Sequence, residues 1–416
     1  MMKKIISIII CGMLLFACIT SLASCSKDKE EASKSDVKTL YVYNWGEYMS
    51  DGSDDSLDVN KAFEDWYYET YGEYVEVNYS TYSSNEDLYA KITSGAISYD
   101  VIVPSDYMVQ RLKDEGYLAE LNYENIPNME NILDEFKGSN AYYDENNQYS
   151  VPYLYGMIGI IYNTTMVDPN DPDIGSWSLL WDEDYKGNIL QFNNPRDAFG
   201  TAQYYLGIDV NTATEAELRE ALELLKAQKN IVQGYVMDEI YNKMENGSAA
   251  IAAYYAGDYL TMYENNTDLE FYYPKEGTNF YVDAMCIPAA SKNKLIAERY
   301  INFMLSEEAA VANAEYTYYA SPNELVVNNE EYIEYMSEIK EDAYDKMYNT
   351  DGIKATAYED LGNEKLVMLN SLWEELKSDV DIGIGIYICC GVIILGLIVL
   401  FVAYTVKKRS RKKMYE

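Results

Sequence analysis

The stretch LYVYNWGEYMSDG, residues 40–52, starts as an apolar strand and places Trp45, Glu47 and Tyr48 where that strand should end. Similar short runs recur along the chain, rich in Val, Ile and Tyr and bounded by turn residues. They are YVEVNYS (74–80), YDVIVPS (99–105), MIGIIYN (157–163) and GNILQFN (187–193). Each of these runs predicts a short, largely buried strand.

Helical patterns lie between these runs, with apolar residues at spacings of three and four. They are EDLYAKITSG (86–95), MVQRLKDEGYL (108–118), TEAELREALELLKAQK (214–229) and IAERYINFMLSEEAAVANAEY (296–316). Strands that alternate with helices predict mainly parallel sheets covered on both faces, which is an α/β fold. Ligands of such folds collect at the carboxyl ends of the strands, so the ends NWGEY, STYSSNEDLY and PSDY should meet.

An aromatic ring beside a carboxylate at a strand end is suited to one kind of ligand. The face of Trp45 attracts a cation, and Glu47 accepts a charge-assisted hydrogen bond from an ammonium group. Rings could cover the methylenes of an alkylamine while acids hold its ends. Taken alone, core aromatics beside a solvated turn acid are the more common interpretation.

Composition narrows the class of partner. A chain of 416 residues suits two lobes or domains. Its formal net charge is −37, although basic residues cluster at both ends, so the body between them is more acidic still. Such a surface repels phosphate backbones and attracts cations, which argues against a nucleic-acid partner.

Several kinds of catalysis are excluded by the residues present. The sequence contains no His, which removes Ser-His-Asp and Cys-His nucleophiles, His metal sites and the most common general base. Cys286 is the one cysteine of the body, and its apolar setting predicts a buried, inert thiol. We therefore expect no enzyme, no cofactor and no metal; a glycosidase-type carboxylate pair stays open, because acids are too abundant for spacing to identify one.

The two ends predict a location. Residues 1–24 have the basic start, apolar run and small-residue site of a secretory signal, and LASC resembles a lipobox that would make Cys25 the lipidated first residue. The polar stretch after it is a tether. Residues 382–406 carry no charge and are long enough for a transmembrane helix, and a basic tail follows. Both anchors predict an ectodomain on the outer face of the membrane, extracellular or periplasmic.

From about Thr39 to Lys377 the chain resembles the substrate-binding proteins of bacterial spermidine/putrescine ABC transporters. The segments that carry the resemblance are LYVYNW.EY, STY.SNE..YAK, VPS.Y, W..L with YKG, and P.EG...Y.DA..IP. The resemblance implies a two-lobed, hinged α/β fold of the periplasmic-binding-protein type II class, with a ligand cleft between the lobes. It implies chain crossings near Pro152 to Gly156 and Asp283 to Pro288.

These features together give a predicted domain division. It comprises a signal peptide (1–24), a tether (25–37), lobe 1 (38–153 and 285–322), lobe 2 (154–284 and 323–378), a transmembrane helix (382–406) and a basic cytoplasmic tail (407–416).

The resemblance also implies ligand-binding residues, position by position. They are Trp45, Glu47, Tyr48, Ser105, Tyr107, Asn194, Asp197, Tyr255, Asp258, Tyr281, Asp283 and Tyr319. The chain departs from the family pattern at Asn194, where an acid is frequent, and at Tyr255 and Tyr281, where Trp is frequent. Asp258 matches an acid of putrescine-type members, and Asp283 fits the most characteristic amine-binding acid. A last polar contact would fall near Tyr358 or Glu359.

The predicted function is that of a monomeric receptor that binds putrescine or spermidine and delivers it to the permease subunits of an ABC transporter. Four acids, Glu47, Asp197, Asp258 and Asp283, permit either amine. Alternatives are a receptor for another amine or cation, including ferric ion held by adjacent tyrosines such as Tyr254 and Tyr255, and a surface-anchored glycosidase.

Overall fold

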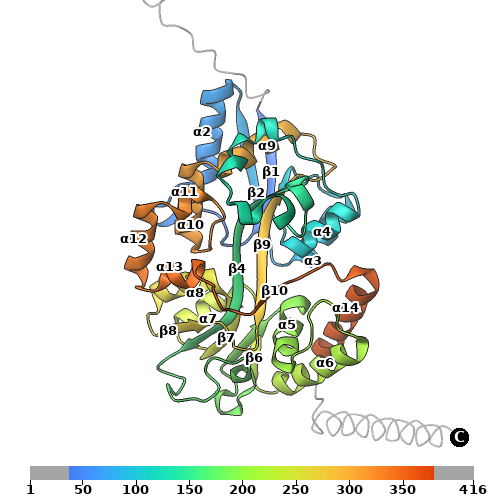
Figure 1. Cartoon of the computed structure of the whole chain (residues 1–416), viewed down its shortest axis with the longest axis vertical. Helices are drawn as coiled ribbons and strands as arrows, with labels where there is room; N and C mark the ends of the chain where they lie inside the picture. Colours follow the sequence, from blue (N-terminus) through green and yellow to red (C-terminus); the bar gives the residue numbers. More distant parts are fainter. Residues whose placement is uncertain (1–36, 379–416) are drawn as a thin grey trace, which may run out of the picture.

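The structure is a computed structural model and describes residues 37–378. Its strands form two groups, one in each lobe, and two long strands run through both (Figure 1). The strand order is β2-β1-β3-β9-β4-β7-β5-β6, with β10 beside β9 and β8 beside β4. The α/β class and the two-lobed arrangement expected from the sequence are confirmed.

The first lobe is built around three parallel strands. They are β1 (Lys38–Trp45), β2 (Val75–Tyr82) and β3 (Val101–Ile102). Its helices are α2 (Val59–Tyr71), α3 (Asn85–Ser94), α4 (Asp106–Asp114), α9 (Lys294–Met304) and α10 (Glu307–Thr317). Leu40 and Val42 of β1 and Phe63 of α2 are fully buried in its core.

The second lobe also has a parallel centre, since β5 pairs in parallel with both β6 and β7. Its strands are β5 (Ile189–Phe192), β6 (Val232–Val236), β7 (Ile251–Tyr255) and β8 (Leu269–Tyr272). Its helices are α5 (Pro195–Leu206), α6 (Glu215–Lys229), α7 (Glu239–Glu245), α8 (Ala256–Asn265) and α14 (Gly362–Ser378). A capping box between Thr214 and Glu217 fixes the start of α6.

Strands β4 (Ser150–Asn163) and β9 (Thr278–Cys286) join the two lobes. They pair with each other in antiparallel register from Ser150 to Met157, after which β4 pairs with β7 and β8. The expected mainly parallel sheet therefore holds inside each lobe, whereas every strand pair made by β4, and the pair of β3 with β9, is antiparallel. The antiparallel pair of β4 with β9 joins the two lobes.

Several remaining elements lie beside these lobes. Helices α11 and α12 contact α10, and α13 contacts α8 (Figure 1). Their bounds, with that of β10, are α11 (Glu324–Val327), α12 (Glu330–Ile339), α13 (Ala343–Tyr348) and β10 (Ala355–Ala357). Short 3-10 helices occupy 53–55, 123–125, 127–131, 134–136, 138–140, 145–147, 177–181 and 183–185.

Two local predictions need correction. The helical pattern at 296–316 forms two helices, because the Ser306 side chain accepts a hydrogen bond from the Ala309 amide and starts α10 anew. The run 99–105 gives a strand of only two residues, since Pro104 and Ser105 already lead into α4.

The predicted fold also needs correction in its transmembrane helix, which the described residues do not contain. Between residues 37 and 378, no helix is both long enough and apolar enough to cross a bilayer. The last described helix, α14, is amphipathic instead: it buries Leu372 and Trp373, packs on α6 and α5, and carries charged side chains such as Glu374. The segment 382–406 itself lies outside the described residues, as do the signal segment and Cys25.

Candidate functional site

A cavity lies between the lobes, where β1, β3, β5 and β7 end. Helices α3, α4, α5 and α8 begin at its wall, so short loops at strand ends supply most of its side chains. It is lined by Trp45, Gly46, Tyr48, Tyr82, Ser83, Ser84, Asn85, Glu86, Ser105, Asp106, Tyr107, Asn194, Asp197, Met237, Asp238, Tyr241, Tyr254, Tyr255, Asp258, Asn279, Tyr281, Asp283, Tyr319 and Tyr358.

The structure brings the sequence-predicted site residues together in this cavity, with one exception. Glu47 does not line it; its side chain is exposed and its backbone lies in the left-handed region at φ 47°. A non-glycine residue adopts that region at a cost, and here it follows Gly46 in the turn after β1. Partial desolvation and the nearby Asp238 carboxylate raise the pKa of Glu47 although much of the residue is exposed.

Asp283 lies at the centre of the site, on the strand β9 that joins the lobes. Its carboxylate accepts hydrogen bonds from Tyr48 Oη (2.7 Å) and Ser105 Oγ (2.6 Å). Asn85 Nδ2 donates in turn to Ser105 Oγ (3.1 Å), which fixes that hydroxyl. Asp283 is only 4% exposed, and burial raises its pKa to about 7. Three segments distant in the sequence therefore hold one buried acid.

Asp197 belongs to the first turn of α5, opposite the first lobe. Asn194 caps this helix, because its side chain accepts a hydrogen bond from the Asp197 amide (2.8 Å). Asn194 Nδ2 also donates to Asp197 Oδ2 (2.8 Å), and Tyr255 Oη donates to the same oxygen (2.7 Å). Burial raises the pKa of the Asp197 carboxyl. Its second oxygen accepts no hydrogen bond within the described part of the chain.

Asp258 occupies the first turn of α8 and is held by two tyrosines. Tyr241 Oη donates to Oδ1 (2.7 Å) and Tyr319 Oη donates to Oδ2 (2.9 Å). Gly257 makes the second contact possible, since a Cβ there would lie 2.1 Å from the Tyr319 ring. Burial raises the pKa of Asp258 to about 7.

Sequence reasoning missed three acids of the cavity, Glu86, Asp106 and Asp238. Glu86 accepts a hydrogen bond from Tyr107 Oη (3.2 Å). Asp106 is fully buried and accepts bonds from Tyr142 Oη and from the amides of Tyr107 and Val282, so it ties the start of α4 to β9 and to the loop of Tyr142. Glu86 and Asp106 lie in the strand-end segments STYSSNEDLY and PSDY. Acids in the first turn of a helix are common because they stabilise the helix, so these two gave no separate signal of a binding site. Asp238 follows β6, a strand that the sequence pattern did not reveal.

The charge of the cavity is one-sided. Six carboxyl groups line it, and no Lys or Arg from residues 37–378 does so. Burial is the main cause of the raised pKa of each of these carboxyl groups. It raises the pKa values of Asp106, Asp258 and Asp283 to about 7. Carboxyl groups with raised pKa values hold protons that a bound cation would displace.

Aromatic rings form much of the remaining wall. Trp45 packs against Tyr82 with ring centroids 4.6 Å apart, and Tyr48 meets Tyr319 edge to face at 4.7 Å. Tyr281 meets Tyr255 edge to face at 5.6 Å. These contacts hold the rings in fixed positions, so their faces and hydroxyls are pre-arranged for a ligand.

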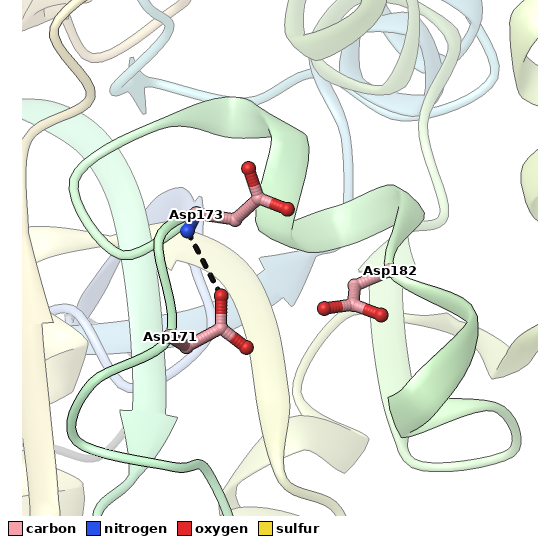
Figure 2. A group of neighbouring side chains, drawn as sticks. All are labelled: Asp171, Asp173 and Asp182. Carbon is pink, nitrogen blue, oxygen red and sulfur yellow. Dashed lines mark hydrogen bonds between the residues drawn. The ribbon is translucent and has the colours of Figure 1, made fainter.

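A separate group of acids lies in the second lobe, away from the cavity. Asp171, Asp173 and Asp182 point toward one another (Figure 2). Asp171 accepts hydrogen bonds from the Asp173 amide (2.8 Å) and Tyr185 Oη (2.7 Å), and Asp173 accepts one from Ser178 Oγ (2.6 Å). These bonds are those of turn-capping side chains in a loop.

Known proteins share this architecture and much of the sequence. The family described as bacterial extracellular solute-binding protein matches residues 60–342. The spermidine/putrescine-binding periplasmic protein of Salmonella typhimurium is 36% identical over 293 residues, which cover 70% of this chain and 80% of that protein. The putrescine-binding periplasmic protein PotF of Escherichia coli is 27% identical over 77% of this chain and 85% of its own length.

Solved structures agree with these relatives. The spermidine/putrescine ABC transporter substrate-binding protein PotD of Streptococcus pneumoniae superposes with a TM-score of 0.62 at 32% identity, covering 82% of this chain and 98% of that one. The TpPotD lipoprotein of Treponema pallidum gives a TM-score of 0.65 at 25% identity, covering 82% and 99%. The resemblance drawn from the sequence motifs is confirmed. The chain belongs to the bacterial extracellular solute-binding protein family.

Proposed function

We propose that the protein is a receptor for a polyamine, putrescine or spermidine, which it delivers to the permease of an ABC transporter. One observation carries the proposal: a cavity between two lobes is lined by six carboxyl groups and many aromatic rings, without a Lys or Arg from the described residues. Ammonium groups need buried acceptors, and the methylenes between them need apolar cover. The names of the relatives support the same ligand class.

In this proposal the three carboxyl groups of Asp197, Asp258 and Asp283 bind the ammonium groups, while the aromatic residues cover the carbon chain. Trp45, Tyr48, Tyr107, Tyr255, Tyr281 and Tyr319 supply the rings and hydroxyls, and Ser105 and Asn194 orient the acids. Glu47 acts from outside the cavity wall through its charge. The acids release protons when the cationic ligand binds, because their raised pKa values keep part of them neutral in its absence.

Ligand binding would be coupled to closure of the lobes. Asp283 lies on β9, one of the two strands between the lobes, and it accepts hydrogen bonds from Tyr48 and Ser105 of the first lobe. We assign lobe 1 to 38–153 and 285–322 and lobe 2 to 154–284 and 323–378. A ligand that contacts acids of both lobes favours the closed arrangement, which the permease would recognise.

The remaining parts of the proposal concern place and partners. Cys25 would carry the lipid, and residues 26–36 would tether the receptor to the outer face of the membrane. The receptor would act as a monomer and would not be an enzyme, in keeping with a family of binding proteins.

Ferric ion is a weaker candidate for this cavity. Iron-binding tyrosines must lose their protons, but burial raises the pKa of both Tyr254 and Tyr255 well above its usual value. Nearby Asp258 and Asp197 raise these pKa values further. The aromatic rings of the wall also suit the carbon chain of an alkylamine, which ferric ion lacks.

Calorimetric titration of the purified protein, stripped of bound amines, tests the proposal. We expect saturable one-to-one binding of putrescine or spermidine. Absence of saturable heat with putrescine, spermidine and spermine alike would reject it.

A further inference from the structure

Strand β9 presents three residues to the cavity from alternate positions. Asn279, Tyr281 and Asp283 all line it, as expected for side chains that share one face of a strand. Asp283 and Tyr281 are already part of the proposed site. Asn279 is not among the residues that the sequence motifs indicate.

The amide oxygen of Asn279 lacks a hydrogen-bond partner within the described residues, as do Trp45 Nε1 and Tyr281 Oη in the same wall. The Asn279 side chain is 3% exposed, and its Oδ1 is buried. Buried side-chain oxygens are nearly always paired, because an unpaired one loses its hydration without compensation. A ligand that donates a hydrogen bond to Asn279 Oδ1 would explain why this oxygen has no partner within the protein.

Asn279 is connected to Asp197 through Tyr358. It pairs with Thr356 of β10, and Tyr358 follows two residues later in the cavity wall. Tyr358 in turn reaches α5, where a Cβ on Gly200 would lie 2.1 Å from its hydroxyl. Asp197 belongs to the first turn of that helix, and its negative charge contributes to the raised pKa of Tyr358.

We propose that the Asn279 carboxamide oxygen is a ligand-binding acceptor that, together with Asp197, recognises a terminal primary ammonium group. A primary ammonium has three N–H donors and needs acceptors in several directions. Asp197 Oδ2 already accepts from Asn194 and Tyr255, which leaves its other oxygen for one donor. Asn279 supplies a further acceptor without adding charge. This inference rests on the proposed polyamine function. The two acceptors would make the site selective for unsubstituted amine ends.

The test compares wild type with Asn279→Leu, which has similar volume and no polar atoms. Calorimetry should show putrescine binding about tenfold weaker in the variant than in wild type, the effect of losing one hydrogen bond to a charged group. With N,N,N′,N′-tetramethylputrescine, whose ends keep one N–H each, the two proteins should agree within about twofold. Thermal unfolding of the unliganded variant should occur at the same or a higher temperature, because an unpaired buried acceptor is removed.

Asn279→Asp provides the matched control, since it keeps the oxygen and should bind putrescine at least as well as wild type. If the leucine variant does not fold, Asn279→Asp becomes the test variant. A loss of putrescine affinity of tenfold or more in Asn279→Asp would then overturn the inference. Unchanged putrescine affinity in Asn279→Leu, or an equal loss for both amines, overturns it while leaving the proposed function intact. Failure of wild type to bind any amine overturns the proposed function and this inference with it.

Discussion

The chain gathers acids in two places, the cavity between the lobes and the loop that holds Asp171, Asp173 and Asp182 (Figure 2). In the loop, the carboxylates accept bonds from amides and hydroxyls a few residues away, and all three acids are partly exposed. In the cavity, Asp283 accepts bonds from Tyr48 and Ser105, which are far away in the sequence.

This difference teaches that proximity of acids does not by itself indicate a cation site. The loop acids stabilise the turns that contain them, and water solvates the rest of their charge. The cavity acids lose hydration on burial, and their pKa values rise as a result. Burial also raises the pKa of the partly exposed Asp182, but it raises those of the buried Asp258 and Asp283 to about 7, so these cavity acids gain most from a cationic ligand.

Replacing Asp283 with Asn should have the largest effect on binding. The variant removes the central anion while keeping the side-chain shape, so the affinity for putrescine or spermidine should fall about 10- to 100-fold. Calorimetry gives the dissociation constants, and thermal unfolding at pH 7 shows whether the variant is folded. An affinity within twofold of wild type would remove Asp283 from the site.

Lowering the pH from 7.5 to 5.5 should weaken polyamine binding by about tenfold or more. Asp258 and Asp283 have pKa values of about 7, so at pH 5.5 both must lose protons before they pair with ammonium groups. Titrations in two buffers of different ionisation enthalpy should reveal proton release at pH 6.5. Affinity that is independent of pH over this range would contradict the account.

The same raised pKa values fix the sign of a stability effect. The folded protein holds protons on these acids that the unfolded chain has already lost above about pH 4, so stability without ligand falls as pH rises from about 4 toward 7. Because polyamine binding should be weaker at pH 5.5, the increase in unfolding temperature caused by spermidine should be larger at pH 7.5 than at pH 5.5.

Replacing Trp45 with Leu should have a smaller effect, about three- to tenfold weaker binding, because a cation over a ring contributes about 0.5 to 2 kcal/mol. The ring packs on Tyr82, so leucine keeps much of the contact with the core. Diamine titrations measure the loss. A larger loss than that of Asp283→Asn would mean that ring contacts outweigh charge in this cavity.

Replacing Asp173 with Asn should have the smallest effect on binding and is the matched control for the Asp283 variant. The asparagine oxygen can still accept the hydrogen bond from Ser178, so polyamine affinity should change by less than about twofold and stability by less than about 1 kcal/mol. Calorimetry and denaturant unfolding check both values. A marked loss of affinity would show that charge acts on the ligand from well outside the cavity.

The fold could be predicted in outline because strand runs such as 40–45 and 187–193 carry strong local signals. What the pattern could not show is long-range pairing: β4 begins at Ser150, seven residues before the predicted run, because its first half pairs with β9 across the lobes. The break between α9 and α10 rests on one cap at Ser306, which the continuous apolar spacing hides. The transmembrane prediction rested on an uncharged apolar run and the basic tail after it, both outside the described residues.

The site could be predicted to the extent that family motifs mark strand ends. Those motifs located Asp197, Asp258 and Asp283, which the structure places around one cavity. Glu47 is the one predicted site residue that does not line the cavity; it has a left-handed backbone, which spacing does not report. The motifs gave no sign of Asn279, whose role depends on the absence of a partner in three dimensions.

A crystal structure of the complex with spermidine tests the central claim most directly. We predict that ammonium nitrogens lie within about 3 Å of carboxylate oxygens of Asp283 and of Asp197 or Asp258, with the carbon chain against Trp45 and the tyrosine rings. Spermidine bound outside this cavity, or inside it without a contact to these carboxylates, would contradict the account.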